Sequence, residues 1–262
     1  MRFTISLAQM QVVFGKPREN LKKAVQFIET TAAHGSHAIL LPELWSSGYD
    51  LENAASLARH TPEIIAELHR LASHHTLRIG GSLLDHQPDG IYNTFVWVDP
   101  ALSQPLYYRK IHLFRLMAEH QWLMPGNQPA IIPTPWGLSG LAICYDLRFP
   151  ELFRGYALEG ARTFLLPAEW PDRRIEHWKI LLRARAIENQ CFMFAVNCIG
   201  ASPKDQFGGC SAAVSPWGET IAEGSASDEM LLHAELDTEL VDQARQFMPV
   251  FQDRRPDVYG EG

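Results

Sequence analysis

Residues 138–151 read LSGLAICYDLRFPE, and this stretch decides how the chain is expected to fold. It opens with small and apolar residues that are typical of a buried strand, turns polar from Tyr145, and reaches Pro150, a favoured first residue of a helix. A strand that leads into a helix is the repeating unit of α/β proteins. The sequence therefore predicts an α/β fold with Cys144 at the end of a strand and next to a helix N-terminus.

The same alternation runs through the rest of the chain. Helical spacing of apolar residues predicts helices over 21–32, 61–74, from 150 onward and 174–189. Apolar runs predict strands over 3–10, 37–42, 77–84, 91–98, 106–108, 130–132, 138–143, 163–166, 192–196, 211–214, 220–223 and 230–236. Turn signals at 88–90, 135–137 and 216–218 join strands directly, which favours a mixed sheet over a purely parallel one.

The domain organisation follows from length and composition. The chain has 262 residues, of which 46% are hydrophobic, enough for one large core. No linker rich in proline or serine divides it, so we expect one domain over residues 1–262. Residues 247–262 are expected to form a C-terminal arm that is either disordered or lies across a partner subunit.

Charge and cysteine content exclude several classes of protein. The net charge of -7 and the absence of a basic run argue against partners such as nucleic acid or anionic lipid. No apolar run approaches 18 residues and the N-terminus reads as a strand, so neither a membrane span nor a signal peptide is expected. Four cysteines without a Cys-x-x-Cys pair or a histidine cluster suggest no zinc site and no disulfide framework. A cytoplasmic protein with reduced thiols is the expectation.

Cys144 is the first candidate for chemistry. Its position, at a strand end that opens towards a helix N-terminus, is where α/β folds place their sites and where a thiolate is favoured. A buried cysteine acting as a small hydrophobe is the alternative that its context leaves open. For Cys191, Cys198 and Cys210, which flank or begin apolar strands, we expect core packing.

Glu43 and Lys110 are the next two candidates. Glu43 ends the apolar stretch 39–42 and precedes Leu44 and Trp45, surroundings that raise a carboxyl pKa towards the range of a general base. Lys110 follows the strand at 106–108 and could stabilise the charge that develops on a carbonyl oxygen. Taken singly, Glu43 could equally start a helix or form a salt bridge, and Lys110 could be a solvated surface lysine.

Three segments together resemble the nitrilase superfamily of carbon–nitrogen hydrolases. They are Leu-Pro-Glu at 41–43, Tyr-Arg-Lys-Ile-His-Leu at 108–113, and residues 140–151 around the cysteine. They occur in the family's order and at similar separations. Further matches extend the resemblance over nearly the whole chain, at Glu119, at residues 185–189, at Asn197 and at the Ser-Pro-Trp-Gly turn of 215–218.

The resemblance implies a four-layer α-β-β-α sandwich and a Glu–Lys–Cys triad. In this chain Glu43 would act as the general base, Cys144 as the nucleophile, and Lys110 with the backbone N–H of Tyr145 as the oxyanion donors. Glu119 matches a second active-site glutamate that would orient Lys110 or position the substrate. The chemistry requires no metal and no organic cofactor. Family members usually form dimers, so a homodimer or a higher homo-oligomer is expected.

The omega-amidase branch fits best, because Tyr145-Asp146 follows the cysteine where nitrile-cleaving members typically have Trp-Glu. This branch implies hydrolysis of the terminal amide of 2-oxoglutaramate or 2-oxosuccinamate, with release of ammonia. Another small amide or an N-carbamoyl compound is the alternative substrate. A non-catalytic binding protein that kept the fold is the alternative from a different class.

An omega-amidase must also bind the carboxylate at the far end of its substrate, and an arginine fork suits that task. The candidates lie after the nucleophile or in the segment that follows the strand at 163–166. They are Arg148, Arg173 and Arg174, with Trp170 and Tyr145 as further substrate-binding residues. For each arginine, a purely solvent-exposed position is the alternative.

Overall fold

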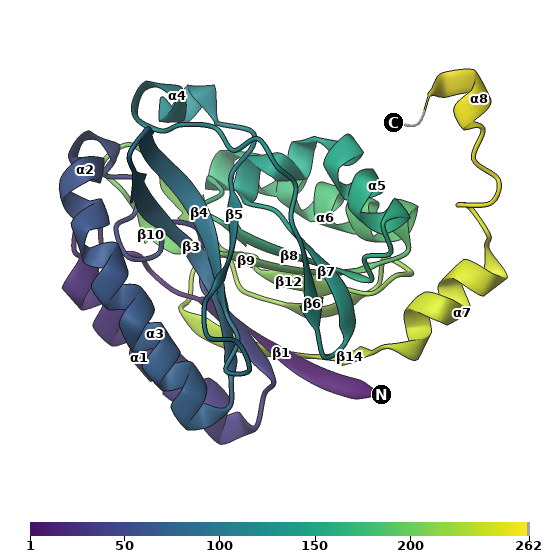
Figure 1. Cartoon of the computed structure of the whole chain (residues 1–262), viewed down its shortest axis with the longest axis horizontal. Coiled ribbons are helices and arrows are strands. Elements are labelled where there is room, and N and C mark those ends of the chain that lie inside the picture. Colours follow the sequence, from purple (N-terminus) through teal and green to yellow (C-terminus); the bar gives the residue numbers. More distant parts are fainter. Residues whose placement is uncertain (261–262) are drawn as a thin grey trace.

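The computed structural model describes residues 1–260 and contains two six-stranded mixed sheets (Figure 1). The first sheet has the order β14 (Met230–Asp237), β1 (Arg2–Gln9), β2 (Ala38–Leu40), β3 (Arg78–Gln87), β4 (Gly90–Val98) and β5 (Leu106–Arg109). The second has the order β13 (Thr220–Glu223), β12 (Ala212–Val214), β9 (Phe192–Asn197), β8 (Thr163–Ala168), β7 (Gly137–Leu141) and β6 (Ile131–Thr134).

Helices cover the outer face of each sheet, as Figure 1 shows. Apolar residues of α1 (Pro17–His34) and α3 (Thr61–His75) share a core cluster with β2 and β3 of the first sheet. Apolar residues of α5 (Pro150–Leu158) and α6 (Ile175–Asn189) pack on the second sheet. The layers are therefore helix, sheet, sheet and helix, which confirms the expected α-β-β-α sandwich.

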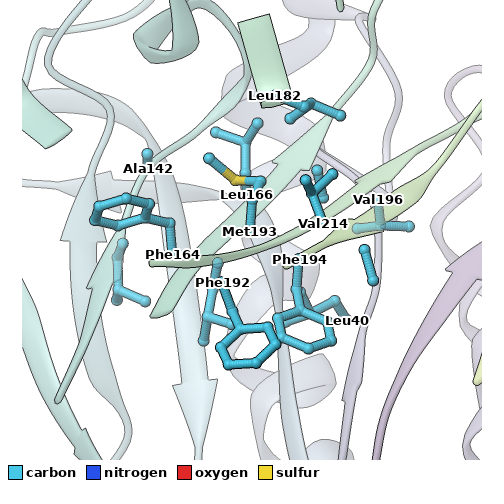
Figure 2. Packing of buried hydrophobic residues seen from close by; sticks show 14 of the residues in the cluster. Leu40, Ala142, Phe164, Leu166, Leu182, Phe192, Met193, Phe194, Val196 and Val214 are labelled. Atoms are coloured by element: carbon cyan, nitrogen blue, oxygen red, sulfur yellow. The ribbon is translucent and has the colours of Figure 1, made fainter. Parts of the chain in front are cut away.

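Strand β9 shows how the middle of the molecule is packed. In Figure 2, Phe194 of β9 lies next to Leu40 of the first sheet. Met193, its neighbour in sequence, points to the opposite face, on the side where Leu182 of α6 lies. Successive side chains of a strand alternate between its faces, and both faces are buried here. This double burial explains why 192–196 is apolar at every position.

Most of the predicted elements are present within one or two residues of their expected bounds. The hairpin turn at 88–90 joins β3 to β4, and the turn at 135–137 joins β6 to β7. The α-helices and strands that were not predicted are α2 (Ala54–Leu57), α4 (Glu119–Trp122), α7 (Glu239–Phe247), α8 (Pro256–Tyr259), and the two-stranded ribbon of β10 (Ile199–Ala201) with β11 (Gln206–Gly208). All of them except α7 have only three or four residues, too few for a periodic pattern to be seen. Helix α7 has nine residues, but only two of them are buried.

Parallel strands at the centre of each sheet bring several loops to the same edge. β2 runs parallel to β1 and β3, and β8 runs parallel to β7 and β9. The carboxyl ends of parallel strands meet on one side of a sheet, where α/β proteins place their sites. Segments that are far apart in sequence therefore converge after β2, β7 and β8.

The C-terminal segment leaves the body of the molecule after β14. Helix α7 (Glu239–Phe247) packs through two buried residues, and the short helix α8 (Pro256–Tyr259) follows it (Figure 1). In the expected arm, residues 247–262, the Phe251 ring lies under two guanidinium groups, at 5.2 Å from that of Arg154 and 5.1 Å from that of Arg245. Residues 261 and 262 of the arm lie outside the described residues, and its role at a subunit interface stays a prediction.

Candidate active site

The three residues of the expected triad lie together, each just beyond the end of a strand. Glu43 follows β2, Lys110 directly follows β5, and Cys144 follows β7. All three side chains are buried, with 5% or less of each residue exposed. The two sheets thus bring together residues that are up to 101 positions apart, from 43 to 144.

Cys144 occupies a sharp turn at the end of its strand. Its φ angle is 44°, in the left-handed region that residues other than glycine rarely adopt. The turn continues as a short 3₁₀ helix, Cys144–Arg148, and α5 begins only at Pro150. A strained turn directly after a strand is also the place where hydrolases of other folds carry their nucleophile.

The protonation state of Cys144 differs from the expectation that a helix N-terminus favours its thiolate. Burial, and then the negative charge of Glu43, raise the pKa of the thiol well above its ordinary value, although Lys110 opposes the shift. The 3₁₀ segment is too short, and α5 begins too far away, for a helix dipole to outweigh these effects. The resting group is therefore a neutral thiol, which needs a base before it can attack.

Asp146 holds the nucleophile turn against the loop that carries Lys110. Its Oδ2 atom accepts hydrogen bonds from Ile143 N at 2.9 Å and from the Tyr108 hydroxyl at 2.7 Å. Its Oδ1 atom accepts from His112, through the backbone N at 3.1 Å and Nδ1 at 2.7 Å. Because Tyr108 and His112 flank Lys110 in sequence, one buried carboxylate fixes the nucleophile relative to the lysine.

The carboxylate of Glu43 is held by three donors. Its Oε1 atom accepts hydrogen bonds from Lys110 Nζ and from Asn93 Nδ2, both at 2.7 Å. Its Oε2 atom accepts from the backbone N–H of Glu169 at 2.9 Å. These contacts orient the group next to Cys144, where a general base for the thiol must lie.

Lys110 lies between two carboxylates. Its Nζ atom is 2.7 Å from Oε1 of Glu43 and 2.6 Å from Oε1 of Glu119, and all three side chains are fully buried. Burial alone would lower the pKa of Lys110, but the charges of Glu119 and Glu43 outweigh it and raise that pKa. The ammonium group is thus kept charged, as an electrostatic oxyanion donor must be.

Glu119 begins helix α4 and anchors Lys110 from the other side. Its Oε1 atom also accepts a hydrogen bond from the Tyr49 hydroxyl at 2.6 Å, and its Oε2 atom accepts from the backbone N–H of Phe114. Burial raises the pKa of this carboxyl group, against the lowering effect of Lys110. Glu119 contacts Lys110 directly, and its role in orienting the lysine or positioning the substrate stays a prediction.

A small pocket opens beside the thiol. It is lined by the following residues from the loops after β7 and β8 and from the Lys110 loop: Phe114, Cys144, Tyr145, Arg148, Glu169, Trp170, Pro171 and Arg174. The guanidinium groups stack on aromatic rings, Arg148 on Trp170 at 4.8 Å and Arg174 on Phe114 at 5.1 Å. Four of the five expected substrate-binding residues therefore surround Cys144.

Arg173, the fifth, lies outside this pocket. Its side chain is 59% exposed, and its Nη2 atom pairs with Oδ1 of Asp205. It lines a neighbouring cavity of about 490 Å³, together with Tyr49 and Asp205. Adjacent residues of the 3₁₀ turn Asp172–Arg174 point in different directions, which sequence alone could not resolve.

Three further residues of the site were missed in the sequence: Tyr49, Asn93 and Glu169. Tyr49 lies in an irregular loop and Asn93 within a strand, so neither follows a pattern that indicates a site. Glu169 directly follows β8, as Lys110 follows β5, and that placement was an available signal. Burial, and then the charge of Glu43, raise the pKa of the Glu169 carboxyl group well above its usual range.

The remaining cysteines fit their expected role in core packing. Cys191, Cys198 and Cys210 are free thiols that are each at most 4% exposed, and all three belong to hydrophobic clusters.

Within residues 1–260, no group of three or more His, Cys, Asp or Glu side chains is arranged to hold a metal ion. In the same part of the chain, no helix has the length and apolar character needed to cross a membrane.

The chain is similar to known proteins over nearly its whole length. A family model described as carbon-nitrogen hydrolase matches residues 4–246. The chain is 41% identical to the 2-oxoglutaramate amidase of Bacillus subtilis, over 99% of this chain and 100% of that protein. It is 31% identical to the omega-amidase NIT2 of Homo sapiens, over 98% of this chain and 96% of that protein. Among solved structures, a CN-hydrolase superfamily protein from Xanthomonas campestris with an arsenic adduct in its active site superposes with a TM-score of 0.91. That protein is 28% identical, and the match covers 97% of this chain and 98% of the other.

Proposed function

The chain belongs to the carbon–nitrogen hydrolase family, and from this premise we propose that it is an omega-amidase. Its substrate is a short 2-oxo acid with a terminal amide, 2-oxoglutaramate or 2-oxosuccinamate, and its products are the 2-oxo-dicarboxylate and ammonia. The observation that carries the proposal is the buried group of Glu43, Lys110 and Glu119 beside the Cys144 thiol. Similarity to a 2-oxoglutaramate amidase over the whole chain supports the choice of substrate.

The reaction begins with proton transfer from a neutral thiol. Glu43 takes the proton from Cys144 as the sulfur attacks the amide carbon, so the thiolate forms only when the substrate is present. The negative charge on the carbonyl oxygen is then stabilised by the ammonium group of Lys110 and the backbone N–H of Tyr145. Because Glu119 and Glu43 already fix Lys110, little reorganisation accompanies this step.

The tetrahedral intermediate breaks down when Glu43 returns its proton to the amide nitrogen. The carbon–nitrogen bond breaks, ammonia leaves, and the acyl group remains on Cys144 as a thioester. Glu43 next removes a proton from water, which attacks the thioester carbon. Collapse of this second intermediate releases the carboxylic acid, returns the proton to sulfur and restores the free thiol.

The far carboxylate of the substrate is bound by Arg148 and Arg174. Burial, and then the positive charges of Arg173 and Arg148, lower the pKa of the Arg174 guanidinium, and a bound anion would relieve this repulsion. In addition, the Nη2 atom of Arg174 is buried and has no hydrogen-bond partner among the described residues. An unpaired guanidinium N–H that lines a pocket is a fitting donor for a carboxylate oxygen.

Substrate entry requires side chains of the pocket to move. The free volume beside the thiol is about 10 Å³, roughly the space of one water molecule. Tyr145 and Arg148 are half-buried and line this pocket, so we assign the movement to them.

The enzyme is further proposed to act in the cytoplasm as a single-domain protomer of a homodimer or higher homo-oligomer, with residues 247–262 at the subunit interface.

The test is ammonia release from a panel of amides by the purified enzyme. The panel contains 2-oxoglutaramate, 2-oxosuccinamate, an N-carbamoyl amino acid and propionamide. The 2-oxo acid amides are expected to be hydrolysed with the highest kcat/KM, and Cys144→Ala is expected to abolish turnover with an unchanged far-ultraviolet circular dichroism spectrum. Cys210→Ala, which removes another buried free thiol, is the matched control and should retain activity. Faster release from the N-carbamoyl compound or propionamide would reject the proposed substrate, and no release at all would favour a binding protein.

A further inference from the structure

Glu169 is the buried ionisable group of the pocket that the reaction steps do not use. Only 1% of the residue is exposed, and it lines the same pocket as Cys144, Arg148 and Arg174. Its backbone is fixed, because its N–H donates to Glu43 Oε2 at 2.9 Å and the next N–H, of Trp170, donates to Asn197 Oδ1 at 2.6 Å. The carboxyl group is therefore held at a defined place on the pocket wall.

The carboxyl group itself lacks a partner for at least one oxygen. The Oε1 atom of Glu169 is buried and has no hydrogen-bond partner within residues 1–260. It lies beside Gly48, and a Cβ atom built on this glycine would be 3.8 Å from the Oε1 atom. Because glycine has no side chain, Gly48 offers this oxygen no polar side-chain partner. A buried polar atom without a partner costs about 1–3 kcal/mol, and the residue that carries it lines the pocket of Cys144, so a substrate group that pairs with this carboxyl group would be stabilised.

The charge around Glu169 decides in which form it meets that ligand. Burial, and then the nearby Glu43 carboxylate, disfavour a second negative charge at this place and raise the pKa of the Glu169 carboxyl group. In its neutral form the group has one O–H donor in addition to its acceptor oxygen. It can therefore donate a hydrogen bond to a neutral oxygen of a substrate, which an ionised carboxylate cannot do.

The other polar groups of the proposed substrate already have partners in the site. The amide lies at Cys144, Glu43 and Lys110, and the carboxylate at the two arginines. The 2-oxo oxygen remains, and it can only accept a hydrogen bond. Resting on the proposed function, we propose that Glu169 is a specificity-determining residue that donates its carboxyl O–H to the 2-oxo oxygen of the substrate.

The experiment compares two substrates that differ only in this oxygen. These are 2-oxoglutaramate and glutaramate, which has two hydrogen atoms at C2. Glu169→Met removes the donor at similar size, and Glu169→Gln keeps a neutral donor. In the Met variant, kcat/KM for 2-oxoglutaramate is expected to fall about tenfold more than kcat/KM for glutaramate. The Gln variant is expected to retain the wild-type preference within about threefold.

Each outcome decides the assignment. Equal losses for both substrates in the Met variant, or no loss for either, would overturn the role of Glu169 while leaving the amidase proposal intact. Loss of the preference in the Gln variant would overturn it as well. If Met at position 169 prevents folding, as seen in a thermal melt, Glu169→Leu is the second variant without a donor. A wild-type enzyme that hydrolyses glutaramate as well as 2-oxoglutaramate would overturn the substrate class and this inference together.

Discussion

The two sides of the pocket differ in how completely their ionisable groups are paired. On the side of Glu43, Lys110 and Glu119, every charged atom has partners at 2.5–2.9 Å. Tyr49 and Asn93 donate hydrogen bonds to these carboxylates, and the Oδ1 atom of the neutral Asn93 amide is the one atom of these five side chains without a partner among the described residues. On the other side, formed by the loop after β8, Glu169 Oε1 and Arg174 Nη2 are buried and have no partner among the described residues.

This difference separates catalysis from recognition. A network whose charged atoms are all paired holds its charges where they are needed during the reaction, without reorganisation. Unpaired buried groups raise the free energy of the empty site, and a substrate that pairs with them lowers it. We infer that the side of Glu43, Lys110 and Glu119, the paired side, performs the chemistry common to amides. The side of Glu169 and Arg174, the unpaired side, selects the substrate.

The largest effect is expected from removing the cation of the paired side. Lys110→Met leaves Glu43 and Glu119 buried without their shared ammonium group. The kcat should fall about 10³-fold, and the free energy of unfolding should drop by about 3–5 kcal/mol. Steady-state kinetics measure the fall in kcat, and urea denaturation measures the loss of unfolding free energy.

The matched control is Lys23→Met, whose surface pair with Glu229 should contribute under about 1 kcal/mol to stability. A Lys110→Met protein as stable and active as the wild type would contradict the role of the network.

On the unpaired side, Arg174→Leu should impair binding of anionic substrates. The KM for 2-oxoglutaramate is expected to rise tenfold or more, about 1.4 kcal/mol, because a charged hydrogen bond to the carboxylate is lost. The kcat/KM for uncharged propionamide should change little. Arg70→Leu is the control, since that side chain is 59% exposed and pairs with Glu67 on α3, away from the pocket. Equal changes for both substrates would remove Arg174 from carboxylate recognition.

Tyr49→Phe tests how far the paired side depends on each of its hydrogen bonds. The substitution removes the hydroxyl that donates to Glu119 at 2.6 Å but leaves Lys110 in place. We expect kcat to fall several-fold, about 1 kcal/mol, with an unchanged KM, because the lysine is less firmly oriented. A rise in KM without a change in kcat would instead assign Tyr49 to substrate binding.

The smallest effect concerns the free energy of unfolding and its dependence on pH. Because the pKa of Glu169 is raised in the folded state, that state holds a proton which the unfolded chain releases above about pH 4.3. Stability of the wild type therefore decreases as the pH rises towards the folded pKa. Glu169→Gln removes this penalty, so its advantage should grow by on the order of 1 kcal/mol between about pH 5 and pH 8.

Urea denaturation at several pH values checks this expectation. Glu29→Gln, at an exposed position of α1, is the matched control and should show no comparable trend. If the difference between wild type and Glu169→Gln were independent of pH, Glu169 would be ionised in the folded protein, and it could not be a hydrogen-bond donor.

The sequence predicted the residues of the paired side better than those of the unpaired side. Glu43, Lys110 and Cys144 lie in short motifs at strand ends, where pattern and family resemblance agree. Glu169 shares that placement but belongs to no motif. The direction of Arg173 and Arg174 depends on a single 3₁₀ turn, which periodicity does not reveal.

The state of the Cys144 thiol illustrates the limit of local inference. Its strand and turn could be predicted from residues 138–151, but its pKa is set by burial and by Glu43, which lies 101 positions away in sequence. In the same way, the α/β class followed from the alternation of elements. The face-to-face packing of two sheets came from family resemblance, because packing depends on contacts between distant segments.

The central claim is that Cys144 carries the acyl group of the substrate during turnover. It is tested by mixing the enzyme with excess 2-oxoglutaramate, quenching with acid within the first turnovers, and measuring the mass of the peptide that contains Cys144. The account predicts a mass increase equal to one 2-oxoglutaryl group in thioester linkage, absent in Cys144→Ala and absent from the peptides of Cys191, Cys198 and Cys210. Ammonia release at the wild-type rate by Cys144→Ala, or an adduct on another cysteine alone, would contradict it.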